Sequence, residues 1–207
     1  MARIDDYNMA LEIGKKELIK RNPLHVCRLS DAQFIEKEDG STTIKLRFLN
    51  RMITISWPDL LFYQDSNEDI LIKEKILILH YLNGSKREDL TGELVTYQDI
   101  PSARFYLDAF HRRVKYPLIN TFGDQPDTLP QLAKELFGAN ASSLGDISVL
   151  IQAFPKIPVT LVIWRGDEEF SSDGTILFDS SIQNILSAED ISELTSMIVY
   201  PLIAKAK

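Results

Sequence analysis

ISVLIQAF (147–154) and VTLVIW (159–164), joined by PKIP (155–158), decide the fold class of this chain. Both runs are apolar and rich in β-branched residues, which is typical of buried strands. We therefore expect two adjacent strands in the core of a sheet. Downstream, a short strand is expected at 175–178, and Ser187 begins a terminal helix with an apolar stripe.

The N-terminal part predicts a helix followed by a three-stranded meander. Asp5 and Asp6 can cap a helix that ends at Asn22–Pro23. Three short runs follow, and those near 44–48 and 53–57 alternate apolar and polar residues. Glu38-Asp39-Gly40 between the first two runs is a hairpin signal, which favours antiparallel pairing.

The middle of the chain predicts mainly helices. Ser66 to Asp69 has the composition of a helix start and Asn83–Gly84 that of a stop, and the length between them favours a helix over a strand. A short strand is expected at 93–97, and Pro101–Ser102 is expected to open a further helix. Pro117 should break or kink that helix, since proline has no backbone N–H. Another helix is expected from Asp127 to Gly138.

Together these elements predict an α+β fold with an antiparallel or mixed sheet and helices packed against it. The 207 residues fit a single domain, with a possible seam near 84–92.

Composition narrows the function classes. The formal charge of −7 provides no overall positive field for the phosphates of a nucleic acid. With a single cysteine, Cys27, the chain forms no internal disulfide and is expected in a reducing compartment. Residues 1–6 lack the apolar core of a signal peptide, and no apolar run is long enough to span a membrane. We expect an acidic, soluble, cytoplasmic protein without a membrane or nucleic-acid partner.

An acidic stretch directly follows the second apolar strand and is the candidate ligand-binding site. Its members, with a carboxylate from the next strand, are Trp164, Arg165, Asp167, Glu168, Glu169 and Asp179. Adjacent carboxylates repel one another, a cost most easily tolerated near a cation or backbone donors. Such a loop could bind a hard metal or supply a proton donor. Alternatively, Asp167 caps a turn and the glutamates are only solvated.

The segment HRRVK (111–115) is a dense basic cluster. Arg112 and Arg113 could bind a phosphate or a carboxylate through forked hydrogen bonds. The simpler interpretation is that these cations complement the dipole at the end of a helix.

Several segments resemble one known family, labelled only as domain of unknown function 3786. They are Ala153–Val159, Trp164–Phe170, Ile176–Ser180, Leu79–Gly84, Thr91–Phe105 and Leu186–Asp190. The resemblance covers most of the chain. It implies no assigned activity, although an iron–sulfur segment in some relatives suggests a link to anaerobic redox or corrinoid metabolism. Cys27 alone cannot hold a cluster, so the link would require an iron–sulfur or corrinoid protein as partner.

Three functional hypotheses follow from these observations. The favoured one is an accessory or ligand-binding protein that uses the loop 165–179. The second is a metal-assisted or acid–base enzyme that uses the same carboxylates. The third is a purely structural or interaction module, in which the loop only shapes a strand connection.

Overall fold

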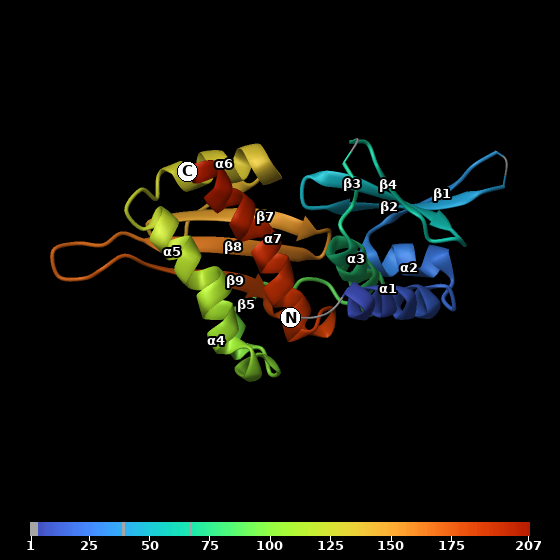
Figure 1. Cartoon of the computed structure of the whole chain (residues 1–207), viewed down its shortest axis with the longest axis horizontal. Coiled ribbons are helices and arrows are strands. Elements are labelled where there is room, and N and C mark those ends of the chain that lie inside the picture. Colours follow the sequence, from blue (N-terminus) through green and yellow to red (C-terminus); the bar gives the residue numbers. More distant parts are fainter. Residues whose placement is uncertain (1–3, 39, 67) are drawn as a thin grey trace. The chain divides into compact units, whose positions relative to one another are not determined.

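The fold has two units, each built around an antiparallel sheet. The computed structural model describes residues 4–38, 40–66 and 68–207 (Figure 1). Unit 1 comprises 1–89, 154–156 and 184–186, and unit 2 comprises 90–153, 157–183 and 187–207. The first boundary, between Asp89 and Leu90, lies in the stretch that the sequence marks as a seam. The predicted α+β class is confirmed, with antiparallel pairing in both sheets.

Unit 1 combines three helices with a four-stranded meander. Its elements are α1 (Ile4–Leu18), α2 (Pro23–Ser30), β1 (Gln33–Glu36), β2 (Thr42–Phe48), β3 (Arg51–Trp57), β4 (Phe62–Gln64) and α3 (Ile72–Gly84). The strands pair in the order β1-β2-β3-β4, one strand more than the sequence predicts. On one sheet face Ile44 lies opposite Ile55 and Leu46 opposite Ile53, and all four are almost fully buried. The alternating pattern of these strands therefore does build the core of the unit.

Local signals in unit 1 are only partly as predicted. α1 ends at Leu18, before Asn22 and Pro23. These two residues begin α2, where the Asn22 side chain accepts a hydrogen bond from the backbone N–H of His25 at 3.0 Å. The long apolar run is a helix, α3, which ends at Gly84 as expected. Two predicted signals, the turn at 38–40 and the helix start at 66–69, include Asp39 and Asn67, which lie outside the described residues.

Unit 2 places helices on a five-stranded sheet. Its strands are β5 (Leu94–Thr96), β6 (Asn140–Ser142), β7 (Ile147–Phe154), β8 (Ile157–Trp164) and β9 (Asp173–Asp179), in the order β5-β9-β8-β7-β6. The expected adjacency of the two apolar strands, β7 and β8, is confirmed. The helices are α4 (Leu107–Phe110), α5 (Tyr116–Phe122), α6 (Thr128–Phe137) and α7 (Ala188–Ala206). Figure 1 shows α5 and α7 crossing one face of this sheet.

The terminal helix α7 forms as predicted. The Ser187 hydroxyl accepts from the backbone N–H of Asp190 at 3.1 Å, and the Asp190 carboxylate accepts from the backbone N–H of Ser187 at 3.2 Å. The predicted apolar stripe is fully buried: Ile191, Leu194, Ile198 and Leu202. This stripe anchors the helix in the core of unit 2.

The helix before Pro117 is widened rather than broken. Residues 101–106 contain only a short 3-10 turn, so the predicted helix begins later, at Leu107. A π-helical segment, His111–Lys115, joins α4 directly to α5, and the backbone N–H of Tyr116 donates to the carbonyl of His111. A wide turn at this place lets the helix continue through Pro117, whose ring cannot fit a regular α-helical turn.

Candidate functional site

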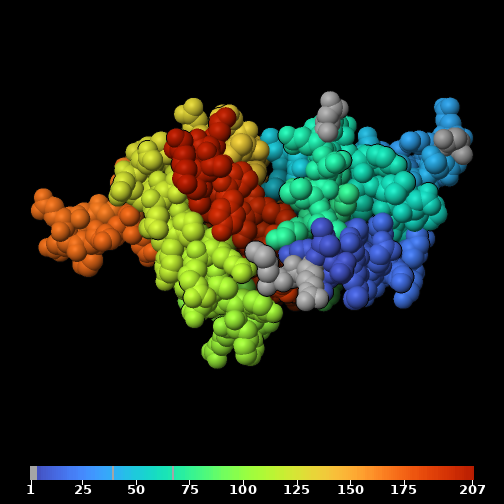
Figure 2. Space-filling model, viewed as in Figure 1, coloured from blue at the N-terminus to red at the C-terminus, as the bar shows by residue number. Residues whose placement is uncertain are grey.

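The acidic stretch forms the loop between β8 and β9. The two strands end in the pair Trp164 and Asp173, so residues 165–172 make the connection. Figures 1 and 2 show this segment, in orange, standing clear of the rest of unit 2. We call residues 164–173 the β8–β9 loop. The side chains of this loop therefore meet solvent, or a partner, more than they meet the unit's own core.

Asp167 holds the tip of the loop in one conformation. Its Oδ1 atom accepts hydrogen bonds from the backbone N–H groups of Glu169 at 2.8 Å and Phe170 at 2.7 Å. In return the Asp167 N–H donates to the Phe170 carbonyl at 2.8 Å. The hydrogen bonds from Phe170 and Glu169 lower the pKa of the Asp167 carboxyl, because they stabilise its charged form.

Glycine allows the two arms of the loop to approach each other closely. A Cβ atom on Gly166 would lie 2.8 Å from the Ser172 backbone nitrogen and 3.0 Å from the Phe170 carbonyl oxygen. Backbone atoms at those distances leave no room for a side chain. The loop is thus folded on itself.

Arg165 anchors the base of the loop to the rest of unit 2. Its guanidinium forms an ion pair with Asp127, just before α6, with Nη2 and Oδ1 2.6 Å apart. Its backbone N–H donates to the carboxylate of Asp146 at 2.8 Å. The guanidinium of Arg165 is therefore engaged with Asp127, outside the loop.

A hollow of about 460 Å³ lies beside the loop. Two of the predicted site residues, Arg165 and Asp167, line it, together with residues that include Asp124 and Phe170. Glu168 and Glu169 are exposed, and Trp164 is partly exposed at the end of β8. The structure thus brings part of the predicted set together around one hollow.

Asp179 lies at the other end of β9. It lies six positions along the extended strand from Asp173, a distance of roughly 20 Å. It is only 4% exposed. Its carboxylate accepts from the backbone N–H groups of Thr91 (3.1 Å), Gly92 (2.7 Å) and Ser181 (3.0 Å), and from the Thr91 hydroxyl. Asp179 therefore ties the start of unit 2 to β9 and does not reach the β8–β9 loop.

Hydrogen bonding also decides the protonation of Asp179. Burial alone would raise the pKa of its carboxyl, but hydrogen bonds from Ser181, Thr91 and Gly92 outweigh burial and lower the pKa to about 2. The carboxylate is therefore ionised at neutral pH, although it is buried. The low pKa therefore comes from the hydrogen bonds by which Asp179 holds residues 91, 92 and 181 together.

The basic cluster divides between solvent and the interior. Arg112 and Arg113 are exposed, whereas His111 and Lys115 line a second cavity and are half-buried. The sequence analysis selected the two arginines and missed the other two residues. The spacing of His111 and Lys115, four residues apart on one helix, is the signal that would have grouped them.

Metal-binding groups of side chains and membrane-spanning helices are both absent from the described residues. No group of three or more His, Cys, Asp or Glu side chains is placed so that it could hold a metal ion, within residues 4–38, 40–66 and 68–207. In the same part of the chain no helix is both long and apolar enough to cross a membrane.

Comparison with known proteins identifies the family. The fold and the site define an α+β chain whose candidate functional feature is a projecting strand connection. The chain belongs to the family described as "Domain of unknown function (DUF3786)", whose model matches residues 22–200. The match includes the β8–β9 loop and most of both units. No curated protein and no solved structure matches the chain.

Proposed function

We propose that this protein is a non-catalytic accessory protein that binds a partner protein through the β8–β9 loop. The observation that carries the proposal is Phe170, whose side chain is 70% exposed at the tip of a loop held in a fixed conformation. Aromatic side chains dominate the affinity of many protein interfaces when they enter a pocket on the partner. Because the turn at Asp167 already holds the backbone of this phenylalanine, little backbone entropy is lost on binding.

The charge next to Phe170 indicates the kind of partner. Glu168 and Glu169 precede it and are exposed, and the chain carries a formal charge of −7. Complementary charge mainly increases the rate and specificity of association. The fitting partner therefore presents an apolar pocket with lysine or arginine at its rim. An iron–sulfur or corrinoid protein is the partner class that the family resemblance implies, and such proteins are the first candidates to test.

The alternative of an enzyme that uses the same carboxylates has less support. Asp167 Oδ1 already accepts two backbone hydrogen bonds, and Asp179 lies roughly 20 Å from the end of the loop. Acid–base catalysis requires its groups within hydrogen-bonding reach of one substrate. A cytoplasmic location remains our proposal, on the ground of the single cysteine.

Replacing the loop's aromatic side chain tests the proposal. A photo-crosslinking residue placed at position 168, next to Phe170, should capture the partner from cells, and the purified partner is then titrated in a calorimeter. We expect Phe170→Ala to weaken the affinity by about thirtyfold or more, as for a central interface aromatic. Phe105→Ala is the matched control, because Phe105 is also exposed, at 93%, but lies outside the loop.

The outcomes separate the hypotheses. Equal affinities for Phe170→Ala, Phe105→Ala and the unmodified protein contradict docking through the loop. Weaker binding only for Phe105→Ala moves the interface to residues 103–105. A crosslink between two copies of this chain makes the partner a second copy, and sedimentation of the unmodified protein and Phe170→Ala then measures that association.

A further inference from the structure

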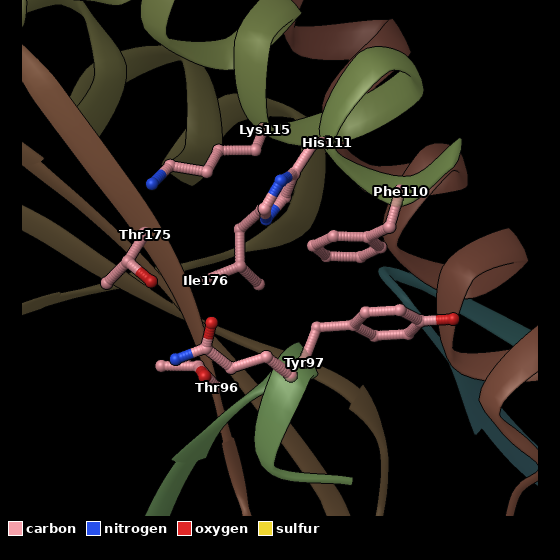
Figure 3. A pocket seen from close by; sticks show the side chains of 8 residues that line it. Thr96, Tyr97, Phe110, His111, Lys115, Thr175 and Ile176 are labelled. Carbon is pink, nitrogen blue, oxygen red and sulfur yellow. The ribbon is translucent and has the colours of Figure 1, made fainter. Parts of the chain in front are cut away.

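A second cavity, of about 100 Å³, lies in unit 2 between the π-helical segment and the sheet. Figure 3 shows His111 and Lys115 reaching down from the helix, with Thr175 of β9 and Thr96 of β5 on the opposite side. These four side chains come from three elements. The cavity is separate from the hollow beside the β8–β9 loop, because the two share no lining residue.

Two stacked aromatic rings form one rigid wall of this cavity. The rings of Tyr97 and Phe110 are nearly parallel, with centroids 3.9 Å apart. The Tyr97 hydroxyl points away from the cavity and donates to the Ala188 carbonyl at 2.9 Å (Figure 3). Both side chains are almost fully buried. The wall is therefore held in place by packing and a hydrogen bond, and exists before any ligand arrives.

Apart from Ile176, the remaining lining is polar and provides hydrogen-bond donors. Lys115 contributes an ammonium group, His111 an imidazole and Thr175 a hydroxyl. The Thr96 hydroxyl donates to the Asp99 carboxylate at 2.7 Å. A half-buried lysine beside a preformed cavity favours a negatively charged group, because the interaction between charges is stronger where water is partly excluded.

Two of these donors come from the π-helical segment. His111 and Lys115 are four residues apart and therefore share one face of the helix, the face that lines the cavity. Val114 is fully buried, while Arg112 and Arg113 are exposed. Single π-turns inside α-helices occur frequently at functional sites, because they cost stability and re-aim side chains.

The carboxylate of Asp173 already forms an ion pair with Lys115. Lys115 Nζ lies 3.4 Å from Oδ1 of Asp173, whose side chain is 64% exposed. The Asp173 carboxylate thus lies on the solvent-exposed side of the pair, where water screens its interaction with the lysine. Asp173 can therefore turn into solvent when another anion approaches Lys115.

We infer that this cavity binds a small oxyanion, either inorganic phosphate or the carboxylate group of a small molecule. Lys115 supplies the positive charge, Thr175 and His111 supply hydrogen bonds, and the Tyr97–Phe110 wall limits the size of the ligand. A cavity of about 150 Å³ holds a molecule such as benzene, so one of about 100 Å³ has room for a single phosphate or carboxylate group.

Lysine substitution tests the site directly. Thermal unfolding of the full chain is followed in increasing inorganic phosphate, in acetate, and in sodium chloride of the same ionic strength. We expect saturable stabilisation by phosphate or by acetate, beyond that in chloride. Lys115→Met should weaken the binding about tenfold, through loss of a charge-assisted hydrogen bond. Arg112→Met is the matched control, since it removes the same charge from the exposed side of the same turn and should leave the affinity unchanged.

A second substitution, Asp173→Asn, should change the affinity for the anion in the opposite direction. Asp173→Asn removes the competing carboxylate and should tighten binding about threefold. If Lys115→Met does not fold, Thr175→Val takes its place with the same expected direction.

The unfolding measurements either support or overturn oxyanion binding in this cavity. Binding of phosphate alone or of acetate alone supports the site and identifies its ligand. A response equal to that in chloride, equal weakening by Lys115→Met and Arg112→Met, or no effect of Asp173→Asn overturns the inference. None of these outcomes depends on Phe170.

Discussion

The two ends of strand β9 carry aspartates of opposite character. At its start, Asp173 and the loop before it are exposed, and the one strongly hydrogen-bonded carboxylate there, Asp167, accepts bonds from its own loop. At its end, Asp179 is buried and accepts bonds from segments nearly ninety residues away in sequence. Both Asp167 and Asp179 have lowered pKa values.

The difference shows that a lowered pKa alone does not mark a functional site. In each case the pKa falls because hydrogen bonds stabilise the charged carboxylate. They come from the Ser181 side chain and from backbone N–H groups at Asp179, and from backbone N–H groups alone at Asp167. Asp167 and Asp179 differ in how much stability is lost when the carboxylate is removed. Loss of Asp179 leaves three N–H donors without their charged acceptor, one of them on the buried residue Ser181, whereas loss of Asp167 exposes its two donors to water. The first residue therefore holds the fold and the second shapes the loop.

Removing the buried carboxylate should have the largest effect. We expect Asp179→Ala to lower the free energy of unfolding by about 3 kcal/mol, because the N–H groups of Thr91, Gly92 and Ser181 lose a charged acceptor. Urea denaturation measures the change. Asp173→Ala, an exposed aspartate at the other end of the same strand, is the control and should cost less than about 0.5 kcal/mol. Similar costs for the two variants would remove the distinction between the two ends.

Acid should weaken the same interaction more gradually. The pKa of Asp179 falls from its ordinary value of 3.8 to about 2 in the folded protein, so its contribution is fully present above pH 4. That contribution is lost as the pH falls from about 4 to about 2, where the folded state must also bind the proton. With allowance for partial solvent screening, it amounts to roughly 1–2 kcal/mol.

Comparison with a variant isolates this contribution from the other carboxylates. The difference in unfolding free energy between the unmodified protein and Asp179→Asn should shrink between pH 5 and pH 2, by roughly that amount. A difference that stays constant over this range would mean that another interaction, not the ionised carboxylate, provides the stability.

The fold was predictable wherever one strong local signal acted alone. The apolar runs at β7 and β8, and the cap at Ser187, each gave the correct element. The prediction was incomplete where one signal had two meanings. Asn22–Pro23 was expected only to end a helix, yet it begins α2, and α1 ends at Leu18. Pro117 was expected to break or kink a helix, and here the helix continues past it through a wide turn.

The sequence indicated where the candidate loop lies, but not which residues surround it in the structure. The run of carboxylates after a buried strand indicated a loop, and residues 165–172 do connect β8 to β9. Asp179 was added because it follows closely in sequence, yet a strand extends about 3.3 Å per residue, which already places it far from the loop. Lys115 and Thr175 escaped notice because the chain brings them together only through tertiary structure.

The smallest effect on stability is expected for Asp167→Ala, a substitution in the loop that we propose binds the partner. Asp167→Ala should leave global unfolding almost unchanged, because the side chain is exposed and its partners lie in the same loop. Locally, the amide protons of Glu169 and Phe170 should exchange with solvent roughly tenfold faster, since they lose their acceptor. Amide exchange measured by NMR tests this, with Glu168→Ala as the control, a neighbouring exposed carboxylate.

A loosened loop should also bind its partner more weakly, although Phe170 remains present. Binding then requires the loop to be ordered, and the entropy of that ordering is subtracted from the affinity. Asp167→Ala should therefore reduce affinity less than Phe170→Ala and more than Glu168→Ala. If faster exchange at residues 169 and 170 leaves the affinity intact, the fixed turn does not contribute to docking, and exposure of Phe170 alone is sufficient for it.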